Sequence, residues 1–456
     1  MRNRLAVILA AGKGTRMKSS MHKVLHSLNG LTMIEYVVRA LKESEIDQIV
    51  TIVGYQAEAV KEVLGQETEF AFQAEQLGTG HAVQQAEDLI GNYAGNTLVI
   101  SGDTPLLTSH TLKAVFDHHE QSGAKATVLT AFAQDPTGYG RVIRRKDQSV
   151  SHIVEQKDGN NQELAVQEIN TGTYIFDNQT LFETLKLVDN NNAQGEYYLP
   201  DVIKILVNQG DKVSAHMMND MEEAIGINDR VALEEASQLM RKRINQFHMK
   251  NGVTLLDVNS TYIEADVVIG QDTIIEGGVS LKGKTTIGSQ VFISSGSEIV
   301  DSKVSDGVKI RQSVIEESQI GAGSQIGPFA HLRPQAVLGQ HVHIGNFVEV
   351  KKSTLGDYTK AGHLSYIGDA EIGNNINVGC GTIFVNYDGK YKHKSIIGDE
   401  SFIGSGVSIV SPVNVGKNTV LAAGSTITQD VPDESLAIAR SRQTNIKNYW
   451  SRFKNK

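Results

Sequence analysis

The sequence predicts two domains of different fold class: an α/β, Rossmann-like domain with a mostly parallel sheet, followed by a parallel β-helix. In the first half, short β-rich runs alternate with helical patterns, which is typical of doubly wound α/β domains. In the second half, an aliphatic residue returns every six positions. The chain has 456 residues, which is long enough for both domains and a connecting element.

The α/β domain is expected over residues 1–229. Residues 5–9 and 49–53 are apolar runs of strand length. The segment between them places Ile34, Val37 and Leu41 on one face of a helix. The order strand, helix, strand is the unit from which parallel sheets are built.

A single amphipathic helix is expected over residues 230–250. Its apolar residues recur at intervals of three and four positions, and Asn251-Gly252 supplies a stop signal. These apolar positions are Leu233, Ala236, Met240, Ile244 and Phe247.

Hexapeptide repeats are expected over residues 251–437. A six-residue period fits neither the 3.6-residue turn of a helix nor the alternation of a strand, so each unit must be a short extended stretch and a turn. Stacked units form a prism with an aliphatic inner layer. The repeated positions are Ile269, Ile275, Leu281, Ile287, Ile293 and Ile299, then Ile320, Ile326, Leu332, Leu338, Ile344 and Val350, and then Ile397, Ile403, Ile409, Val415, Leu421 and Ile427.

The repeats are interrupted at defined places. The spacing contracts between residues 299 and 320, where Val304, Ile310 and Ile315 continue the pattern. The largest break contains the polar and basic segment 386–394, which predicts a projecting loop. Loops on rigid scaffolds tend to carry function.

Composition narrows the classes of function. A formal charge of −9 and a pI near 5.9 argue against a general nucleic-acid binder. The single cysteine, Cys380, excludes an internal disulfide and favours a reducing cytoplasm. No apolar run reaches the roughly 18 to 20 residues that span a bilayer, so a soluble cytoplasmic protein with no membrane partner is expected.

A glycine-rich string, LAAGKGTRM, occupies residues 9–17 directly after the first strand, and Lys23 follows it. Glycines at the carboxyl end of a strand let backbone amides approach a phosphate, and Arg16 and Lys23 would add positive charge there. The string is neither a Rossmann fingerprint nor a Walker A loop. On these residues alone, a phosphate-binding loop and a plain glycine turn with two solvated basic residues both stay open.

The whole string resembles the signature of the sugar-nucleotide pyrophosphorylases. The resemblance implies a uracil-reading loop at residues 73–80 and a Mg²⁺-binding turn at Asp103, with Asn228 as a second metal ligand. The ordinary alternatives are a turn role for Asp103 and a helix-cap role for Asn228. The implied contacts to UTP and UDP-N-acetylglucosamine are Leu9, Ala10, Ala11, Gly12, Lys23, Gln73, Gly78, Thr79, Gly140, Glu155, Asn170 and Asn228.

The reaction that this resemblance implies is attack by a sugar 1-phosphate oxygen on the α-phosphate of UTP, with release of pyrophosphate. No covalent protein nucleophile is required. Mg²⁺, Arg16 and Lys23 would align the reactants and neutralise the charge that builds on the bridging oxygens.

Three motifs near the interruptions, GHLSYIGD at 362–369, NVGCGT at 377–382 and NYDG at 386–389, carry a second resemblance. They resemble the acetyltransferase site of the bifunctional bacterial enzymes that join glucosamine-1-phosphate acetyltransferase to N-acetylglucosamine-1-phosphate uridyltransferase. The resemblance covers essentially the whole chain in the same domain order. It implies left-handed coils, a homotrimer, acetyl-CoA and UTP as co-substrates, and a product used for cell-wall and other cell-surface polymers.

The same resemblance implies that His363 is the general base for the glucosamine amine. Without the flanking match, His363 would be a solvated corner residue, and Cys380 is interpreted as a small coil filler that contacts the thioester through its backbone. The implied contacts to glucosamine 1-phosphate are Arg333, Lys351, Tyr366 and Asn377. Those to acetyl-CoA are Cys380, Asn386, Tyr387, Ser405, Ala423 and Arg440.

Some alternatives stay open. The basic tail 438–456 would attract a phosphorylated adenosine, or be a solvated terminal arm. The chain could be a single-activity pyrophosphorylase whose β-helix only regulates or oligomerises it. It could also be a noncatalytic subunit, for which loss of Lys23 or Asp103 would be the expected sign, and both residues are present.

Overall fold

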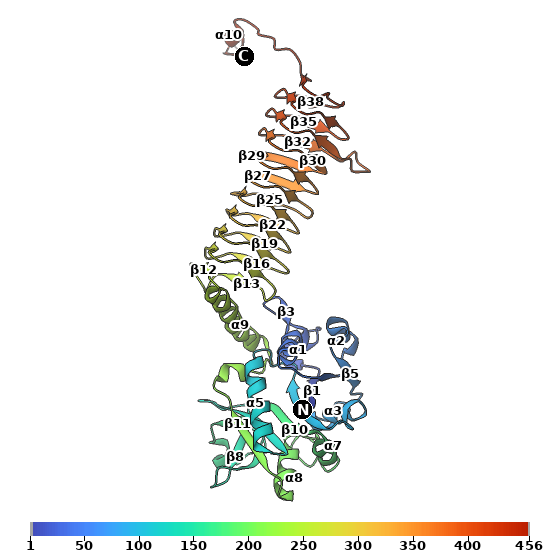
Figure 1. Ribbon diagram of the computed structural model, residues 1–456, viewed down its shortest axis with the longest axis vertical. Helices are drawn as coiled ribbons and strands as arrows, with labels where there is room; N and C mark the ends of the chain where they lie inside the picture. The colour runs from blue at the N-terminus through green and yellow to red at the C-terminus, as the bar shows by residue number, and fades with distance from the viewer. Residues whose placement is uncertain (1–2, 455–456) are drawn as a thin grey trace. The chain divides into compact units, whose positions relative to one another are not determined.

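The computed structural model describes residues 3–454 and contains two compact units, one up to Met240 and one from Arg241 onward. Unit 1 is an α/β domain and unit 2 is a parallel β-helix, as the sequence predicts (Figure 1). Among the described residues, no helix is both long and apolar enough to cross a membrane.

The sheet of unit 1 is mostly parallel, and β10 is antiparallel to both of its neighbours. A hairpin of β8 (Gly140–Arg144) and β9 (Val150–Val154) is added to β10 through β8. In order across the sheet, the strands are β11 (Val213–Met217), β7 (Ala126–Phe132), β10 (Glu168–Asp177), β6 (Gly95–Ser101), β1 (Asn3–Ala10), β4 (Gln48–Val53) and β5 (Glu69–Phe72).

Helices cover both faces of this sheet, because its strands are apolar on both sides. Leu5 and Val7 of β1 belong to one core, whereas Ala6 and Ile8 belong to the other. The first core includes α3 (Thr79–Gln84), α7 (Asn178–Leu185) and α8 (Asp201–Gln209), and the second includes α1 (Met33–Glu43), α2 (Ala57–Leu64) and α5 (Ser109–Ser122). Both faces are therefore closed, and ligands must enter at the strand ends.

The predicted connecting helix is α9 (Arg230–Lys250). Ala236 and Met240 are buried as expected, but Phe247 is 63% exposed. In the last turns the buried positions are Asn245 and His248. Asn245 Nδ2 donates to the carbonyl oxygens of residues 258 and 261 at 2.9 and 3.1 Å, so polar contacts to the first coil turn the phenyl ring outward.

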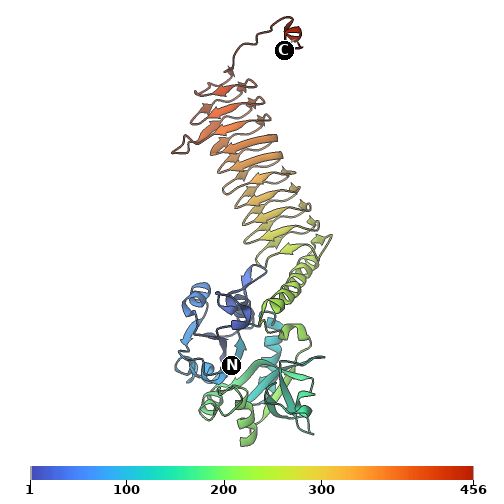
Figure 2. The same ribbon diagram turned by 180° about the vertical axis from the view of Figure 1, so that it is seen from behind.

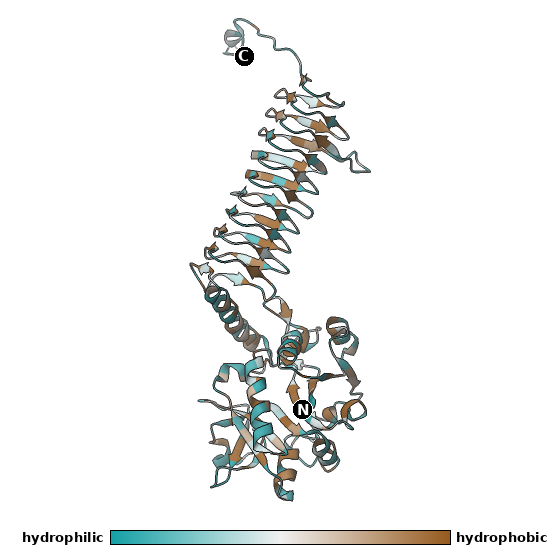
Figure 3. Ribbon diagram, viewed as in Figure 1, coloured by the Kyte–Doolittle hydropathy of each residue, from teal (hydrophilic) through white to brown (hydrophobic). Residues whose placement is uncertain are grey.

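Unit 2 is a column of short parallel strands from β12 (Thr254–Leu255) to β39 (Leu436–Ala437). Each strand pairs with its equivalent one coil further along, as Ile275 does with Ile293 and Ile293 with Ile310. All eighteen repeated aliphatic positions are buried in one continuous core, confirming the predicted inner layer. Hydrophobic segments, drawn in brown, recur along the column in Figure 3.

The contracted repeats shorten the turns and leave the pairing intact, because Val304, Ile310 and Ile315 pair with Ile287, Ile293 and Ile299. The long break is an insertion in one coil. Leu355 pairs with Ile372, and Ile372 pairs with Ile397. Segment 386–394 projects as a loop in both views (Figures 1 and 2), and the His393 N–H closes it by donating to the Asn386 carbonyl at 2.8 Å.

Candidate active sites

The glycine-rich loop after β1 packs against the short 3₁₀ turn Lys23–Leu25. Gly14 has a left-handed backbone with φ of 58°, and a Cβ atom there would lie 2.5 Å from Lys23 Cβ. A residue with a side chain would therefore be strained and would push Lys23 away. This loop and turn place a lysine beside the carboxyl end of the first strand.

Lys23 joins Asp103 to Asn228. Its ammonium forms an ion pair with the Asp103 carboxylate and donates to Asn228 Oδ1 at 2.7 Å. Arg16 Nη2 donates to the same Asn228 oxygen at 2.7 Å. The helix-cap role proposed as an alternative for Asn228 belongs instead to Asp229, whose Oδ1 accepts from two N–H groups in the first turn of α9.

The oxygens of Asp103 and Asn228 fit a magnesium ion. Carboxylate and amide oxygens are the ligands that Mg²⁺ prefers, with waters and substrate phosphates completing its shell. The two oxygens already converge on one cationic group, the Lys23 ammonium. Within residues 3–454 no cluster of three or more Asp, Glu, His or Cys residues could hold a metal, so such an ion would rely on few protein ligands.

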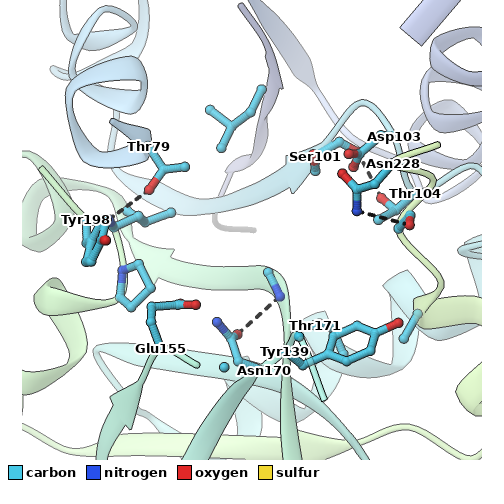
Figure 4. A pocket seen from close by; sticks show the side chains of 18 of the residues that line it. Thr79, Ser101, Asp103, Thr104, Tyr139, Glu155, Asn170, Thr171, Tyr198 and Asn228 are labelled. Carbon is cyan, nitrogen blue, oxygen red and sulfur yellow. Dashed lines mark hydrogen bonds between the residues drawn. The ribbon is translucent and has the colours of Figure 1, made fainter. Parts of the chain in front are cut away.

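Two adjacent cavities meet at these charges. One, of about 470 Å³, is lined by residues 9–12, Lys23, Gln73 and Thr79. The other, of about 580 Å³, is lined by Gly140, Glu155 and Asn170. Arg16 and Asp103 line both, and in Figure 4 Asp103 and Asn228 lie across the second cavity from Glu155 and Asn170.

Gln73 and Gly78 shape the first cavity. Gln73 is buried, and its Nε2 donates to the Gly78 carbonyl at 3.3 Å. Gly78 has φ of 116°, and a Cβ there would lie 2.6 Å from the Tyr197 carbonyl oxygen. Thr79 Oγ1 accepts from the Leu199 N–H at 3.0 Å. The loop at 73–80 is thus held against the segment 197–199.

Glu155 and Asn170 form the far wall of the second cavity. Burial, followed by the nearby Asp158 and Asp201, raises the pKa of the Glu155 carboxyl. Gly140 packs closely against this wall, since a Cβ there would lie 3.1 Å from Glu155 Oε1 and 3.4 Å from Asn170 Cβ.

Sequence analysis missed Arg141, the next residue. Its side chain is only 2% exposed, its Nη2 donates to Gln156 Oε1 at 2.9 Å, and its Nη1 donates to the Tyr139 carbonyl. Gln156 Oε1 also accepts from the Gly138 N–H. Arg141 therefore pins the loop that ends at Gly140. Its burial has no sequence signal, because arginine in a short β run is usually exposed.

In unit 2, His363 begins a column of site residues on successive coils. The Gly381 N–H donates to the Leu364 carbonyl, the Gly406 N–H to the Cys380 carbonyl, and the Gly424 N–H to the Ser405 carbonyl. The strand register makes Ala361, Val378, Ile403 and Leu421 equivalent, so the residues two positions further on, His363, Cys380, Ser405 and Ala423, lie in line on successive coils. At about 4.8 Å per coil the column is roughly 14 Å long. The side chain of Arg440 lies next to Gly424, at the end of the column away from His363.

Three basic residues, Arg333, Lys351 and Lys392, form a cluster of positive charge near this column. Arg333 Nη1 pairs with Glu349 Oε1 at 2.7 Å. Lys392, on loop 386–394, contacts Lys351, and this contact is the main reason why the pKa of Lys351 lies below its ordinary value. Sequence analysis did not single out Lys392, although the basic character of its loop was visible. Neighbouring like charges of this kind favour an anionic ligand.

Two further residues predicted for the sugar and acetyl sites meet beside this cluster. Asn386 is 6% exposed, and its Nδ2 lies 3.4 Å from Tyr366 Oη. By contrast, His363, Asn377, Cys380 and Tyr387 are exposed on the surface of a single chain. Asn377 is on the same coil as Cys380 but in the strand before it, β31 (Asn377–Val378).

An apolar ladder follows the corner that carries His363. Phe329 and Phe347 are stacked with ring centroids 5.6 Å apart, and Leu364 continues the ladder one coil further. All three side chains are about half exposed or more.

Comparisons with known proteins agree along the whole chain. The nucleotidyl transferase family matches residues 5–240, a GMPPB C-terminal domain matches 263–355, and the bacterial transferase hexapeptide family, with six repeats, matches 394–429. Similar proteins named bifunctional protein GlmU include that of Enterococcus faecalis, 58% identical over 98% of both chains. Those of Listeria monocytogenes and Halalkalibacterium halodurans are 54% and 52% identical, over 98% and 100% of both chains.

Proposed function

The chain belongs to the family of bifunctional GlmU proteins, and from this premise we propose which residues carry each half of its two-step synthesis of UDP-N-acetylglucosamine. The enzyme is both an acetyltransferase and a nucleotidyltransferase. It transfers an acetyl group from acetyl-CoA to the amine of glucosamine 1-phosphate, and then a uridylyl group from UTP to N-acetylglucosamine 1-phosphate.

Acetyl transfer takes place at His363. The cluster of Arg333, Lys351 and Lys392 holds the sugar phosphate, and Tyr366 and Asn377 orient the ring. His363 accepts the proton that the amine loses as its nitrogen attacks the thioester carbon. The thioester arm lies along the column of small residues Cys380, Ser405 and Ala423, with the phosphorylated adenosine toward Arg440. The length of that column and its start at His363 support this assignment.

Uridylyl transfer takes place where the two cavities of unit 1 meet. Gln73, Gly78 and Thr79 hold the uracil, the backbone of residues 9–12 holds the phosphates, and Gly140, Glu155 and Asn170 hold the N-acetylated sugar. Arg16 and Lys23 neutralise the phosphate oxygens during transfer. A bound Mg²⁺, held by Asp103 and Asn228, would add further positive charge beside the phosphates. The position of Lys23 between these two residues is the observation that supports the site most directly.

We also propose a homotrimer in the cytoplasm. The ladder of Phe329, Phe347 and Leu364 supports association, because exposed apolar residues beside a site are typical of an interface. A neighbouring chain would then cover the open face around His363. The lone exposed Cys380 fits a reducing compartment.

One pair of variants tests this assignment. We expect His363→Ala to abolish thiol release from acetyl-CoA and to leave uridylyl transfer to N-acetylglucosamine 1-phosphate intact. We expect Asp103→Ala to do the reverse. Each variant is the folding control for the other, and the assignment is wrong if either substitution in a folded sample silences both assays.

A further inference from the structure

The acetyl site contains a carboxylate to which no step above gives a role. Asp369 follows β29 (Lys360–Gly368), and its Oδ2 accepts a hydrogen bond from Asn386 Nδ2 at 2.6 Å. Asn386 is 6% exposed, so its amide is enclosed as well as bonded. A short bond to an ionised acceptor is among the stronger hydrogen bonds in proteins.

This pair fixes which end of the Asn386 amide faces outward. An ionised carboxylate only accepts hydrogen bonds, so it must face the NH₂ group, and a flipped amide would bring two acceptors together. The same NH₂ group lies near Tyr366 Oη. Within residues 3–454 no group donates to Asn386 Oδ1, so the carbonyl oxygen is the end left for a ligand.

The surrounding coils hold Asp369 in place. Its N–H donates to the Lys351 carbonyl on the preceding coil at 3.1 Å, and its carbonyl accepts from the Ser395 N–H on the following coil at 3.2 Å. Gly368 leaves space for the contacts among Tyr366, Asn386 and Asp369, because a Cβ at Gly368 would lie 2.5 Å from Tyr366 Oη and 2.8 Å from Asn386 Nδ2.

We propose that Asp369 is a positioning residue for acetyl transfer: it holds the Asn386 carbonyl oxygen toward the amine of glucosamine 1-phosphate. This inference rests on the proposed function of the site. The neutral amine carries a lone pair and two hydrogens. One hydrogen is accepted by Asn386 Oδ1 and the other faces His363, so the lone pair points at the thioester carbon.

The reaction then balances without another reactant. The nitrogen lone pair forms the bond to the carbonyl carbon, the carbon–sulfur bond breaks, and the sulfur leaves with the electron pair. The amine proton passes to His363 and from there to the thiolate. Asp369 touches neither substrate and acts only through Asn386.

The test begins with Asp369→Asn, which replaces a pure acceptor with a group that can also donate, so the Asn386 amide can flip. We expect kcat for acetyl transfer to fall by roughly 10- to 100-fold, the loss typical of a misplaced group, with KM for acetyl-CoA unchanged. The matched control is Asp399→Asn. Asp399 accepts from Asn374 Nδ2 and the Asn374 N–H, an equivalent pair at a different turn of the coil, and we expect no change.

Two more variants separate orientation from simple support of the fold. The exchange Asp369→Asn with Asn386→Asp restores the donor and acceptor and leaves an oxygen facing the amine, so we expect it to recover at least about ten-fold over Asp369→Asn, within the range of the loss it reverses. Asn386→Asp alone brings two carboxylates together, which must share a proton. Its acetyl transfer should decline as pH rises through the ionisation of that pair, and the exchange variant should lack this decline.

The idea is overturned if Asp369→Asn keeps kcat within about two-fold of wild type, or if the exchange variant recovers nothing while uridylyl transfer and the thermal midpoint show folded protein. A different result would show that the acetyl site itself is wrongly assigned. In that case His363→Ala and Asn386→Ala would both retain acetyl transfer.

Discussion

At the scale of single residues, the proposed uridylyl site depends on glycines at which an added side chain would crowd a neighbour. Gly14, Gly78 and Gly140 each bring backbone within contact distance of a predicted ligand-binding residue or its support. The glycine-rich string indicated the first of these. The other two could be predicted only from family resemblance, because the groups that crowd them come from Tyr197 and Glu155, distant in the sequence.

Gly14→Ala is expected to impair uridylyl transfer by ten-fold or more, because the new methyl group displaces Lys23. Gly123→Ala is the matched control. Gly123 has nearly the same left-handed φ, 62°, but open space around it. Gly123→Ala should lose about 1 kcal/mol of stability through backbone strain, Gly14→Ala should lose at least as much, and only Gly14→Ala should lose activity. Steady-state assays and thermal melts distinguish them, and equal activities would contradict the proposed role of Lys23.

The contact between Lys351 and Lys392 predicts a pH dependence. Because the pKa of Lys351 is lowered, this ammonium loses its charge at a lower pH than an ordinary lysine. KM for glucosamine 1-phosphate should therefore rise with pH, beginning below the usual lysine range. In Lys392→Met, KM at pH 7 should be larger, but the rise should move to higher pH because the main cause of the lowered pKa of Lys351 is removed. An unmoved rise would show that Lys351 does not hold the phosphate.

At the scale of elements, the Asp388 side chain makes three of the contacts that hold loop 386–394. The Asp388 carboxylate pairs with His393 at 2.7 Å and accepts from the N–H groups of Lys390 and Tyr391, also at 2.7 Å. These bonds, led by the one to His393, lower the pKa of Asp388 to about 2. The ionised Asp388 carboxylate therefore stabilises the loop fully above its ordinary pKa, and this stabilisation is lost only as pH falls through about 2.

Asp388→Asn should loosen the loop, because the amide keeps the size of the side chain but loses its charge and part of its acceptor capacity. We expect KM for glucosamine 1-phosphate to rise several-fold, on the order of one lost charge-assisted hydrogen bond, as Lys392 becomes less well placed. Hydrogen exchange across residues 387–392 should quicken. Uridylyl transfer, measured in the same sample, should not change.

The elements also show what periodicity can and cannot predict. The inner layer of the β-helix followed from the six-residue period, since only one side of each unit can face the core. The six-residue period does not predict the path of the inserted loop, so the contact between Lys392 and Lys351 was missed. The outward turn of Phe247 was missed because the apolar pattern of α9 gave no sign that Asn245 would bond the first coil.

At the scale of the whole molecule, the two proposed sites lie in separate compact units, and the proposed association concerns only the second. Strand order alone does not predict that four polar residues converge at this site: Arg16, Lys23, Asp103 and Asn228. Asn228 lies some 200 residues from Lys23 in the sequence. Family resemblance identified these residues, and the fold supplies the reason for their proximity: the Ile227 N–H donates to the Asp103 carbonyl.

Phe347→Asp is expected to break the proposed trimer, because it places a charge within the apolar ladder. Burying one such aromatic side chain contributes roughly 1.5 to 3 kcal/mol, enough to shift association by ten-fold or more. Sedimentation should show smaller species, and acetyl transfer should fall while uridylyl transfer persists. Val268→Asp, at a 60% exposed position on the sheet that does not carry His363, is the control. A fully associated Phe347→Asp would exclude this ladder as the interface.

The position of Lys23 has a consequence for the order in which ligands arrive. An ammonium group that already neutralises Asp103 and donates to Asn228 repels an incoming dication, so magnesium on its own should bind weakly. A triphosphate attracts the lysine to its own oxygens and leaves the two ligands free. Calorimetry should therefore detect tight magnesium binding only together with nucleotide, whereas Lys23→Met should bind the bare ion more readily. Lys23 would then act as an internal counter-ion that makes metal entry depend on the presence of nucleotide.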